Sequence, residues 1–263
     1  MIDTRFLPDR TRALFERLTA EPLLSGFTLV GGSALALQIG HRLSEDLDFN
    51  FFGGRLPTGK ISSLLSALES EGFEIQDLIS HEKKSTFRIN AGHALNLVIQ
   101  DFSIGGAKVS FHSRTEESRP KAQMDFLKAA DRAQFDAAGG FDILGVGGLF
   151  VMKSIVLFDR AKSRDIFDLM VLTRDHGYSM ADMENAVAKF QPPGDRDFER
   201  CKAVLMGKDA LDKDDEGFDG VGISESVEDL YAYFQKMVNE HEVFLAETIA
   251  RSAKRNRTPP LCI

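Results

Sequence analysis

Asp46 and Asp48 are the residues of this sequence best suited to chemistry, since they alternate with apolar residues in the segment from Asp46 to Phe52. That period of two predicts a strand on which residues i and i+2 point to the same face. Two carboxylates held side by side repel each other, so a bound divalent ion or a raised pKa resolves the pair. Magnesium prefers carboxylate and phosphate oxygens as ligands. The pair therefore predicts a metal site for a phosphate-bearing ligand, and two solvent-facing acids on an edge strand are the alternative.

A glycine turn precedes the acid pair, in the segment Gly31-Gly32-Ser33, and follows a short apolar run predicted to be a strand. Ser33 is a suitable N-cap for the apolar helix that comes next. Free N–H groups and the positive end of the helix dipole at such a turn attract phosphates. The order strand, glycine turn, helix, strand predicts a phosphate cradle beside the acids. A calcium loop of the EF-hand type is excluded, because Phe51 stands where that loop needs glycine.

The segment from Leu29 to Phe49 resembles the signature of the AbiEii/AbiGii nucleotidyltransferase toxin family, in which GG[ST]ALAL is followed by HR-x-S-x-DLDF. A second block, Met152-Lys153, Arg160 and Arg164 to Leu169, is similar to that family's downstream pattern of a helix lysine and paired acids. The resemblance implies a DNA polymerase β-like nucleotidyltransferase fold, an α+β (α/β) mixed sheet flanked by helices. It also implies the toxin half of a toxin–antitoxin system, acting on RNA or using an NTP.

The resemblance also implies roles for individual residues. Asp46 and Asp48 would bind Mg²⁺ or Mn²⁺, and Lys153 would neutralise phosphate charge as pyrophosphate leaves. Asp165 or Asp168 would complete the site. The nucleotide would be held by Gly31, Gly32, Ser33 and Arg160. The alternative for the second block is a pair of salt-bridged helices on which Lys153 and Arg160 share one face and the two acids another. His41 either lines the pocket or ends the helix.

The third carboxylate that polymerase-like transferases use is not obvious in this sequence. The matching strand is Ala107-Lys-Val-Ser-Phe111, with Ser110 where an acid is expected. Asp101 is one candidate for the third acid and metal ligand, and an acid of the Arg164–Asp168 segment is another. A chain that binds nucleotide without turning it over is the third possibility, which keeps a non-catalytic binding module as an alternative function.

A second phosphate motif competes with this interpretation, because the segment from Gly54 to Lys60 has the spacing of a Walker A loop. The next residue is Ile61, which removes the hydroxyl that binds magnesium in P-loop proteins. Pro57 also removes one N–H group from the cradle. A P-loop NTPase is the weaker hypothesis.

The elements that must position these residues change in type along the chain. Helical spacing occurs at 8–20, 33–43 and 61–71, and strands are expected at 26–30, 46–52, 73–80, 86–92, 94–102 and 107–113. Beyond about residue 120 helices are expected at 149–158, 164–175, 180–190, 197–206 and 226–254, with an exposed acidic loop at 207–226. The pattern predicts a sheet domain, 1–117, and a mainly helical domain, 118–263.

Composition limits the remaining classes. A net charge of −8 argues against a broad nucleic-acid-binding surface. Two distant cysteines give no zinc or disulfide framework. No apolar run reaches the ~20 residues of a membrane helix, so a cytoplasmic protein is expected. Expected partners are an NTP, an acceptor that is RNA (such as tRNA) or a small molecule, and an antitoxin. The basic run 251–257 is either a solvated helix end or an RNA contact.

Overall fold

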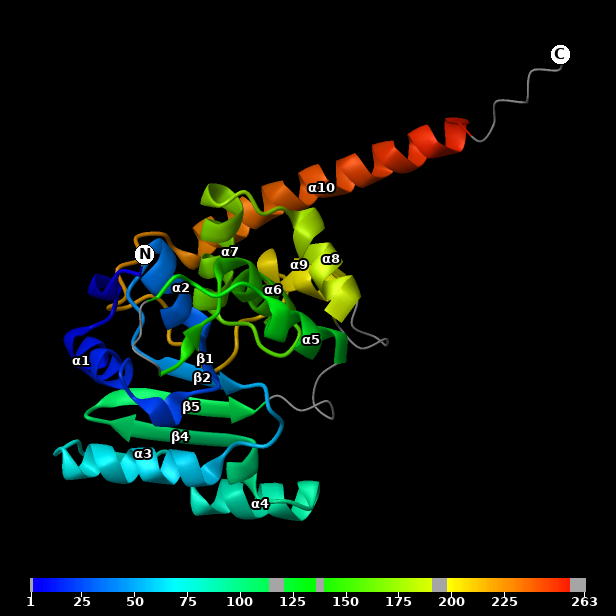
Figure 1. The fold of residues 1–263 in the computed structure, drawn as a ribbon. Coiled ribbons are helices and arrows are strands. Elements are labelled where there is room, and N and C mark those ends of the chain that lie inside the picture. The colour runs from blue at the N-terminus through cyan, green and yellow to red at the C-terminus, as the bar shows by residue number, and fades with distance from the viewer. Residues whose placement is uncertain (1, 114–120, 136–139, 191–197, 256–263) are drawn as a thin grey trace.

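A mixed six-stranded sheet forms the centre of the protein, in the order β3-β4-β5-β2-β1-β6. The computed structural model describes residues 2–113, 121–135, 140–190 and 198–255 (Figure 1). β1 pairs antiparallel with β2, β2 parallel with β5, and β5 antiparallel with β4. The strand bounds are β1 Phe27–Val30, β2 Leu47–Phe51, β3 Ile75–Asp77, β4 Ile99–Ile104, β5 Ala107–Ser113 and β6 Asp142–Ile143. The α+β class expected from the sequence is confirmed.

The alternation within β2 separates an aromatic face of the sheet from a polar one. Phe49 is fully buried and stacks on Phe111 of β5, with 5.6 Å between ring centroids. Phe27 of β1 meets Phe111 edge-on at 5.5 Å on the same face. Asp48 and its cross-strand partner Ser110 point to the opposite face. The sheet therefore buries one face as core and presents carboxylates on the other.

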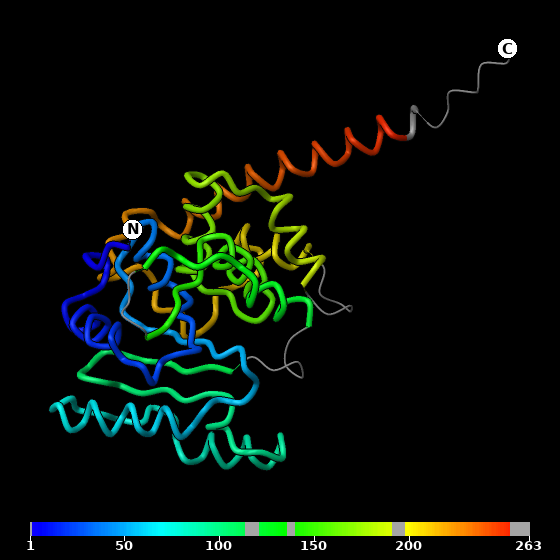
Figure 2. Tube along the Cα trace, in the orientation of Figure 1, coloured from blue at the N-terminus to red at the C-terminus, as the bar shows by residue number. Residues whose placement is uncertain are grey.

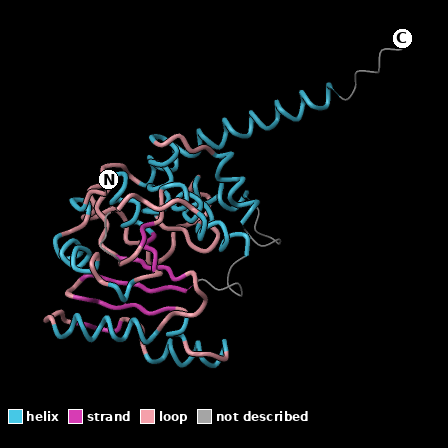
Figure 3. Tube along the Cα trace, viewed as in Figure 1, coloured by secondary structure: helices cyan, strands magenta, loops and turns pink. Residues whose placement is uncertain are grey.

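The helices gather at opposite ends of the molecule. α3 and α4 (cyan) lie below β4 and β5, whereas α6 to α10 lie above β1 and β2 (Figures 1 and 2). Helices surround the strands on several sides (Figure 3). The helix bounds are α1 Asp9–Leu18, α2 Gly31–Ile39, α3 Thr58–Ser70, α4 His81–Ala91, α5 Lys121–Ala129, α6 Val146–Val156, α7 Ser163–Asp175, α8 Met180–Phe190, α9 Phe198–Leu205 and α10 Val227–Arg255. Within the described ranges, no helix combines the length and apolarity that crossing a bilayer requires.

Two local expectations from the sequence are wrong. Residues 86–92 are not a strand but the second half of α4 and its C-cap. The Ser80 hydroxyl accepts a hydrogen bond from the Lys83 N–H at 3.2 Å, and Gly92 caps the other end in the left-handed conformation, so both end signals favour a helix. Ser33 is not an N-cap, because α2 begins two residues earlier at Gly31.

The two halves of the sequence share one hydrophobic core. Its buried members run from Leu7 to Val238. β6, which follows residue 117, pairs in parallel with β1 and so extends the sheet with a strand from the later half. The division into domains 1–117 and 118–263 stays a prediction. The second half of α10 extends away from the rest of the molecule (Figure 1).

Phe49→Ala tests the aromatic layer. The ring is fully buried between Phe111 and Phe141, so its removal leaves a cavity and lowers the free energy of unfolding by about 3 to 5 kcal/mol. Urea denaturation measures the change. Ile89→Ala, at an exposed position of α4, is the control and changes stability by less than about 0.5 kcal/mol. Equal effects of the two substitutions would contradict the assigned core.

Candidate functional site

A cavity of about 320 Å³ lies where the polar face of the sheet meets the helical half of the protein. Acids from the sheet side line it, and so do basic residues from α6 and the segment that leads into α7. The predicted residues that line it are Gly32, Asp46, Asp48, Asp101, Lys153, Arg160 and Asp165. The structure therefore brings both sequence blocks to one place, although more than 100 residues separate Asp46 from Lys153.

Asp48 lies in the middle of the polar face and packs against the glycine turn. Gly31 has a φ of +75°, and a Cβ on it would come within 2.6 Å of Asp48 Oδ2. Only glycine fits this position, because both the backbone conformation and the close approach exclude a side chain. Burial, together with the negative charge of Asp46, raises the pKa of Asp48. The Asp48 carboxylate is thus held in a position where its negative charge is poorly compensated.

Asp46 immediately precedes β2 and is held through its backbone. The Ser33 hydroxyl, buried in the first turn of α2, donates a hydrogen bond to the Asp46 carbonyl oxygen. The Asp46 side chain is 39% exposed and forms an ion pair with Lys108 of β5, with Nζ 3.1 Å from Oδ2. Ser33 therefore links the glycine turn to the acid pair, and its predicted contact with phosphate stays a prediction.

Asp101 is brought to the site by strand register. Ser110 of β5 is the direct partner of both Asp48 on β2 and Asp101 on β4, so the three side chains share one face. Two strand spacings of about 4.8 Å separate the backbones of Asp48 and Asp101. Oδ1 of Asp101 is buried and has no hydrogen-bond partner within the described part of the chain. In the described ranges, no group of three His, Cys, Asp or Glu residues is already arranged to hold a metal ion.

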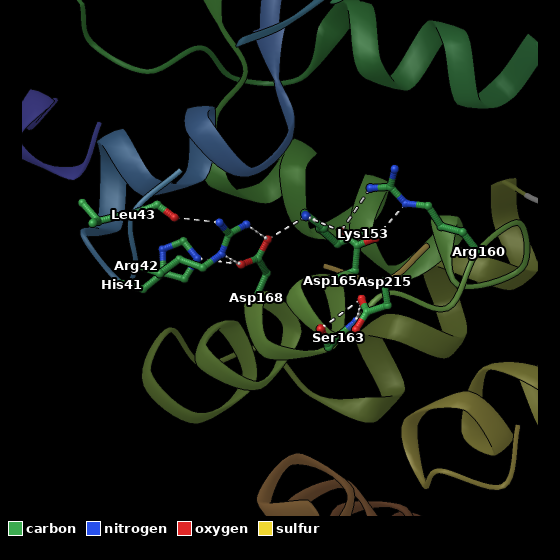
Figure 4. A network of polar contacts seen from close by, with 9 residues as sticks. All are labelled: His41, Arg42, Leu43, Lys153, Arg160, Ser163, Asp165, Asp168 and Asp215. Atoms are coloured by element: carbon green, nitrogen blue, oxygen red, sulfur yellow. Dashed lines mark hydrogen bonds and ion pairs between the residues drawn. The ribbon is translucent and has the colours of Figure 1, made fainter. Parts of the chain in front are cut away.

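Asp165 and Asp168 of α7 form a buried ion network rather than a free acid pair (Figure 4). The Nζ atom of Lys153 on α6 lies 2.5 Å from Asp165 Oδ1 and 2.6 Å from Asp168 Oδ2. Arg160 follows the end of α6, so it does not share a helix face with Lys153, but it reaches Asp165 at 2.8 Å. Asp165 lines the cavity together with Lys153 and Arg160. Asp168 is completely buried and lies behind the cavity.

Arg42 is a residue of the site that the sequence analysis missed. Its buried guanidinium donates to both oxygens of Asp168, at 2.7 and 3.1 Å. A Cβ on Gly32 would come within 2.5 Å of Arg42 Nη2, so the guanidinium also packs against the glycine turn. The His41 side chain is only 3% exposed, and its Nε2 lies 2.8 Å from Asp168 Oδ1, which places it behind the cavity. The HR dipeptide of the first block was a signal for both residues.

The acidic loop 207–226 has no helix or strand, as expected, but it folds back onto the rim of the cavity. Asp215 accepts hydrogen bonds from the Ser163 N–H at 2.9 Å and from its hydroxyl at 3.0 Å, and so caps α7. Lys162 pairs with Asp214 at 2.6 Å, and Arg164 with Glu216 at 2.9 Å. Charge patterning gave no hint of these contacts, because they join segments about 50 residues apart.

The Walker A alternative gains no support. Lys60 lies in the first turn of α3, where its ammonium group donates to the Ser25 carbonyl oxygen at 3.4 Å, and it does not line the cavity that holds Asp48. Neither Gly54 nor Gly59 has an atom within 4 Å of the position a Cβ would take, so neither glycine is required by a close approach.

Asp168→Asn tests the buried network. The substitution leaves Arg42 buried without its counter-charge and leaves Lys153 with Asp165 as its one remaining acid, so the free energy of unfolding at neutral pH falls by about 3 to 5 kcal/mol. Despite burial, Arg42 and Lys153 hold the pKa of Asp168 well below its ordinary value of 3.8. Its stabilisation is therefore complete above 3.8 and is lost as the pH falls through the folded-state pKa. The difference in the free energy of unfolding between the variant and the wild type therefore becomes smaller at acidic pH.

Denaturation with urea at neutral pH and below pH 3.8 measures both effects. Asp175→Asn is the control, because that carboxylate pairs with Arg174 at the surface and its loss changes stability little. An Asp168→Asn variant as stable as wild type at neutral pH would show that the network does not hold the site together.

The chain is similar to several known proteins. The chain is 26% identical over 187 residues to an uncharacterized protein of Aquifex aeolicus, covering 70% of this chain and 76% of that protein. Among solved structures, JHP933 of Helicobacter pylori aligns with a TM-score of 0.48 at 16% identity, over 95% of this chain and 99% of that one. MenT4, a nucleotidyltransferase toxin of Mycobacterium tuberculosis, aligns with a TM-score of 0.43 at 12% identity, over 87% and 86%.

The family model described as nucleotidyl transferase AbiEii toxin, type IV toxin–antitoxin system, matches residues 12–242. This range contains the glycine turn, the acid pair, Asp101 and the Lys153 network. The resemblance seen in the two sequence blocks is thus confirmed over most of the chain, and the protein belongs to the AbiEii nucleotidyltransferase toxin family.

Proposed function

We propose that this protein transfers a nucleotidyl group from an NTP to an acceptor hydroxyl, with Mg²⁺ or Mn²⁺ held by Asp46 and Asp48. The observation that carries the proposal is the half-buried Asp48, which lines the cavity, packs against the glycine turn and has a pKa raised by burial. An acid in that state gains most from a bound cation. Family membership supplies the reaction class.

The residues present fit a hard divalent ion. Asp48 and Asp46 line the same cavity, and the buried Oδ1 of Asp101 lacks a hydrogen-bond partner among the described residues. Magnesium is usually bound by one or two carboxylates together with substrate phosphates and water, so a complete cage of protein ligands is not needed. When bound, the ion would stabilise charge on the attacking and leaving oxygens.

The residues of the chain have separable tasks in this reaction. The acceptor oxygen forms a bond to the α-phosphorus, the bond from that phosphorus to the β-phosphate oxygen breaks, and pyrophosphate leaves. The N–H groups of Gly31 and Gly32, at the N-terminus of α2, bind phosphate oxygens. Lys153 and Arg160 offset the charge of the leaving group. Ser33 fixes the backbone of Asp46 through its hydrogen bond.

Asp101 is the third carboxylate in this proposal. It faces the same side of the sheet as Asp48, and one of its oxygens is not hydrogen-bonded to the described residues. Asp165 is less suitable because Lys153 and Arg160 already neutralise it. A general base needs a free oxygen within reach of the acceptor hydroxyl, which favours Asp101.

The acceptor and the partner are proposed at the level of chemical class. An RNA such as tRNA or a small-molecule hydroxyl would suit a cavity whose rim carries Arg160, Lys162 and Arg164. An antitoxin encoded with the toxin is the proposed protein partner, since the family is that of a type IV toxin–antitoxin system. Arg251, near the end of α10, begins the basic run, and the rest of that run from residue 256 lies outside the described residues.

Asp46→Asn and Asp48→Asn test the acid pair. Each substitution removes a negative charge that the cation requires, so turnover falls by a factor on the order of 100 or more while the circular dichroism spectrum is unchanged. Release of pyrophosphate from NTP in the presence of Mg²⁺ measures turnover.

Asp142→Asn, at an exposed position of β6 in the same sheet, and Lys60→Ala are the matched controls and keep wild-type turnover. Full activity in both acid-pair variants would refute the proposal, and loss of activity in Lys60→Ala alone would favour the P-loop hypothesis. Binding of NTP without any turnover by the wild type would identify a non-catalytic module.

Asp101→Asn tests the third carboxylate. If Asp101 accepts the proton of the acceptor hydroxyl, the variant has a kcat lowered by roughly 100-fold with little change in KM for NTP. Ser110→Asp in the Asp101→Asn background restores a carboxylate between the same two strands and recovers part of the activity. Wild-type kcat in Asp101→Asn, with loss of kcat in Asp165→Asn, would assign the third acid to α7 instead.

A further inference from the structure

Lys108 extends from β5 into the group of carboxylates on the polar face of the sheet. Its ammonium nitrogen lies 3.1 Å from Asp46 Oδ2. The residue lines the cavity that contains Asp48 and Asp101, and also a neighbouring cavity lined by Asp9 and Glu45. Lys108 is therefore a basic residue that lies between two cavities and lines both.

The charge around Lys108 comes from the same acids that are proposed to bind the metal. Partial burial lowers the pKa of Lys108, but attraction to Asp46 and then to Asp48 and Asp101 raises it overall. In return, the positive charge of Lys108 lowers the pKa of Asp48 against the larger effect of burial. The same carboxylates that would attract a divalent cation thus attract the Lys108 ammonium group.

Most other basic residues of the cavity are held by different acids, whereas His112, also on β5, acts on Asp48 and lowers its pKa more than Lys108 does, against the larger effect of burial. Lys153 and Arg160 pair with Asp165, while Lys162 and Arg164 pair with Asp214 and Glu216 of the acidic loop. These contacts keep their charges on the helical side. Lys108 lies on the sheet side, on the strand next to the one that Asp46 precedes.

We propose that Lys108 is the resident counter-ion of the metal site, and that its ammonium group must leave Asp46 before a divalent cation binds there. The inference rests on the proposed function, because it requires a cation site at Asp46 and Asp48. The side chain can move, since it is 46% exposed, has a flexible four-carbon stem and adjoins the second cavity. Asp9 and Glu45 line that cavity, where the displaced ammonium would compete with Arg12 for Asp9 and with the more distant Arg164 for Glu45.

The consequence is a metal affinity that Lys108 lowers in the absence of nucleotide. A cation that must displace an ammonium group from a carboxylate binds less tightly than one that meets the carboxylate free. The NTP brings phosphate oxygens as additional ligands and so favours the exchange. Lys108 would in this way make metal and nucleotide bind together rather than separately.

Mn²⁺ titration of the nucleotide-free protein, followed by the electron paramagnetic resonance signal of free Mn²⁺, tests the inference. Lys108→Met keeps the apolar stem and removes the charge, so Mn²⁺ binds roughly tenfold more tightly, which corresponds to about 1.4 kcal/mol. Lys108→Arg keeps the charge and keeps the wild-type affinity. Thermal unfolding of Lys108→Met without metal stays close to wild type, because a half-exposed ion pair contributes little to stability.

Two controls separate this inference from the proposed function. Lys60→Met removes a lysine remote from the acids and leaves Mn²⁺ affinity unchanged, whereas Asp48→Asn abolishes the binding. Equal or weaker Mn²⁺ binding in Lys108→Met, with Asp48-dependent binding in the wild type, would overturn the role of Lys108 alone. Mn²⁺ binding that is absent, or unaffected by Asp48→Asn, would overturn the metal site and the role of Lys108 together.

Discussion

The ion network between Asp168, Arg42 and Lys153 is the interaction on which the rest of the site depends. Arg42 and Lys153 are buried there and share the compensating carboxylate of Asp168, and Lys153 also pairs with the buried Asp165. Arg42 comes from the segment between α2 and β2, Lys153 from α6, and Asp168 from α7. The network therefore fixes the helical half of the protein against the glycine turn. A side chain at Gly32 would come within 2.5 Å of Arg42 Nη2, so it would displace the guanidinium that pairs with Asp168.

Three acids in and behind the cavity fall into two electrostatic groups, and the difference explains their tasks. Asp165 and Asp168 have lowered pKa values because, against burial, buried cations neutralise them. Asp48 has a raised pKa because burial and a neighbouring carboxylate outweigh the cations near it. Asp165 and Asp168 connect the helices of the site through ion pairs, whereas the negative charge of Asp48 is only partly compensated. Such a deficit costs stability and is expected where a protein must bind a cation or a substrate.

The acidic loop and the basic residues at the start of α7 carry opposite charges and form ion pairs at the edge of the cavity. Asp215 caps α7, and its neighbours Asp214 and Glu216 pair with Lys162 and Arg164. These pairs lie at the surface, so each is weak and can exchange its partner for a phosphate group. The buried network is rigid by comparison. The site thus combines the buried ion network around Asp168, which stays fixed, with the surface ion pairs of Lys162 and Arg164, which can rearrange when a polyanionic ligand binds.

The sequence by itself determined the glycine turn, the strand with its alternating acids and most of the helices, because each follows from local periodicity and end signals. Where local signals conflicted, as at residues 86–92, the caps at Ser80 and Gly92 outweighed the strand-like composition. Tertiary structure alone decided that Asp101 faces the same side as Asp48 and that Lys108 meets Asp46, since strand register and ion pairs join distant segments. The physical reason is that periodicity reports which face a residue occupies, while its neighbours across the sheet depend on how separate segments pack.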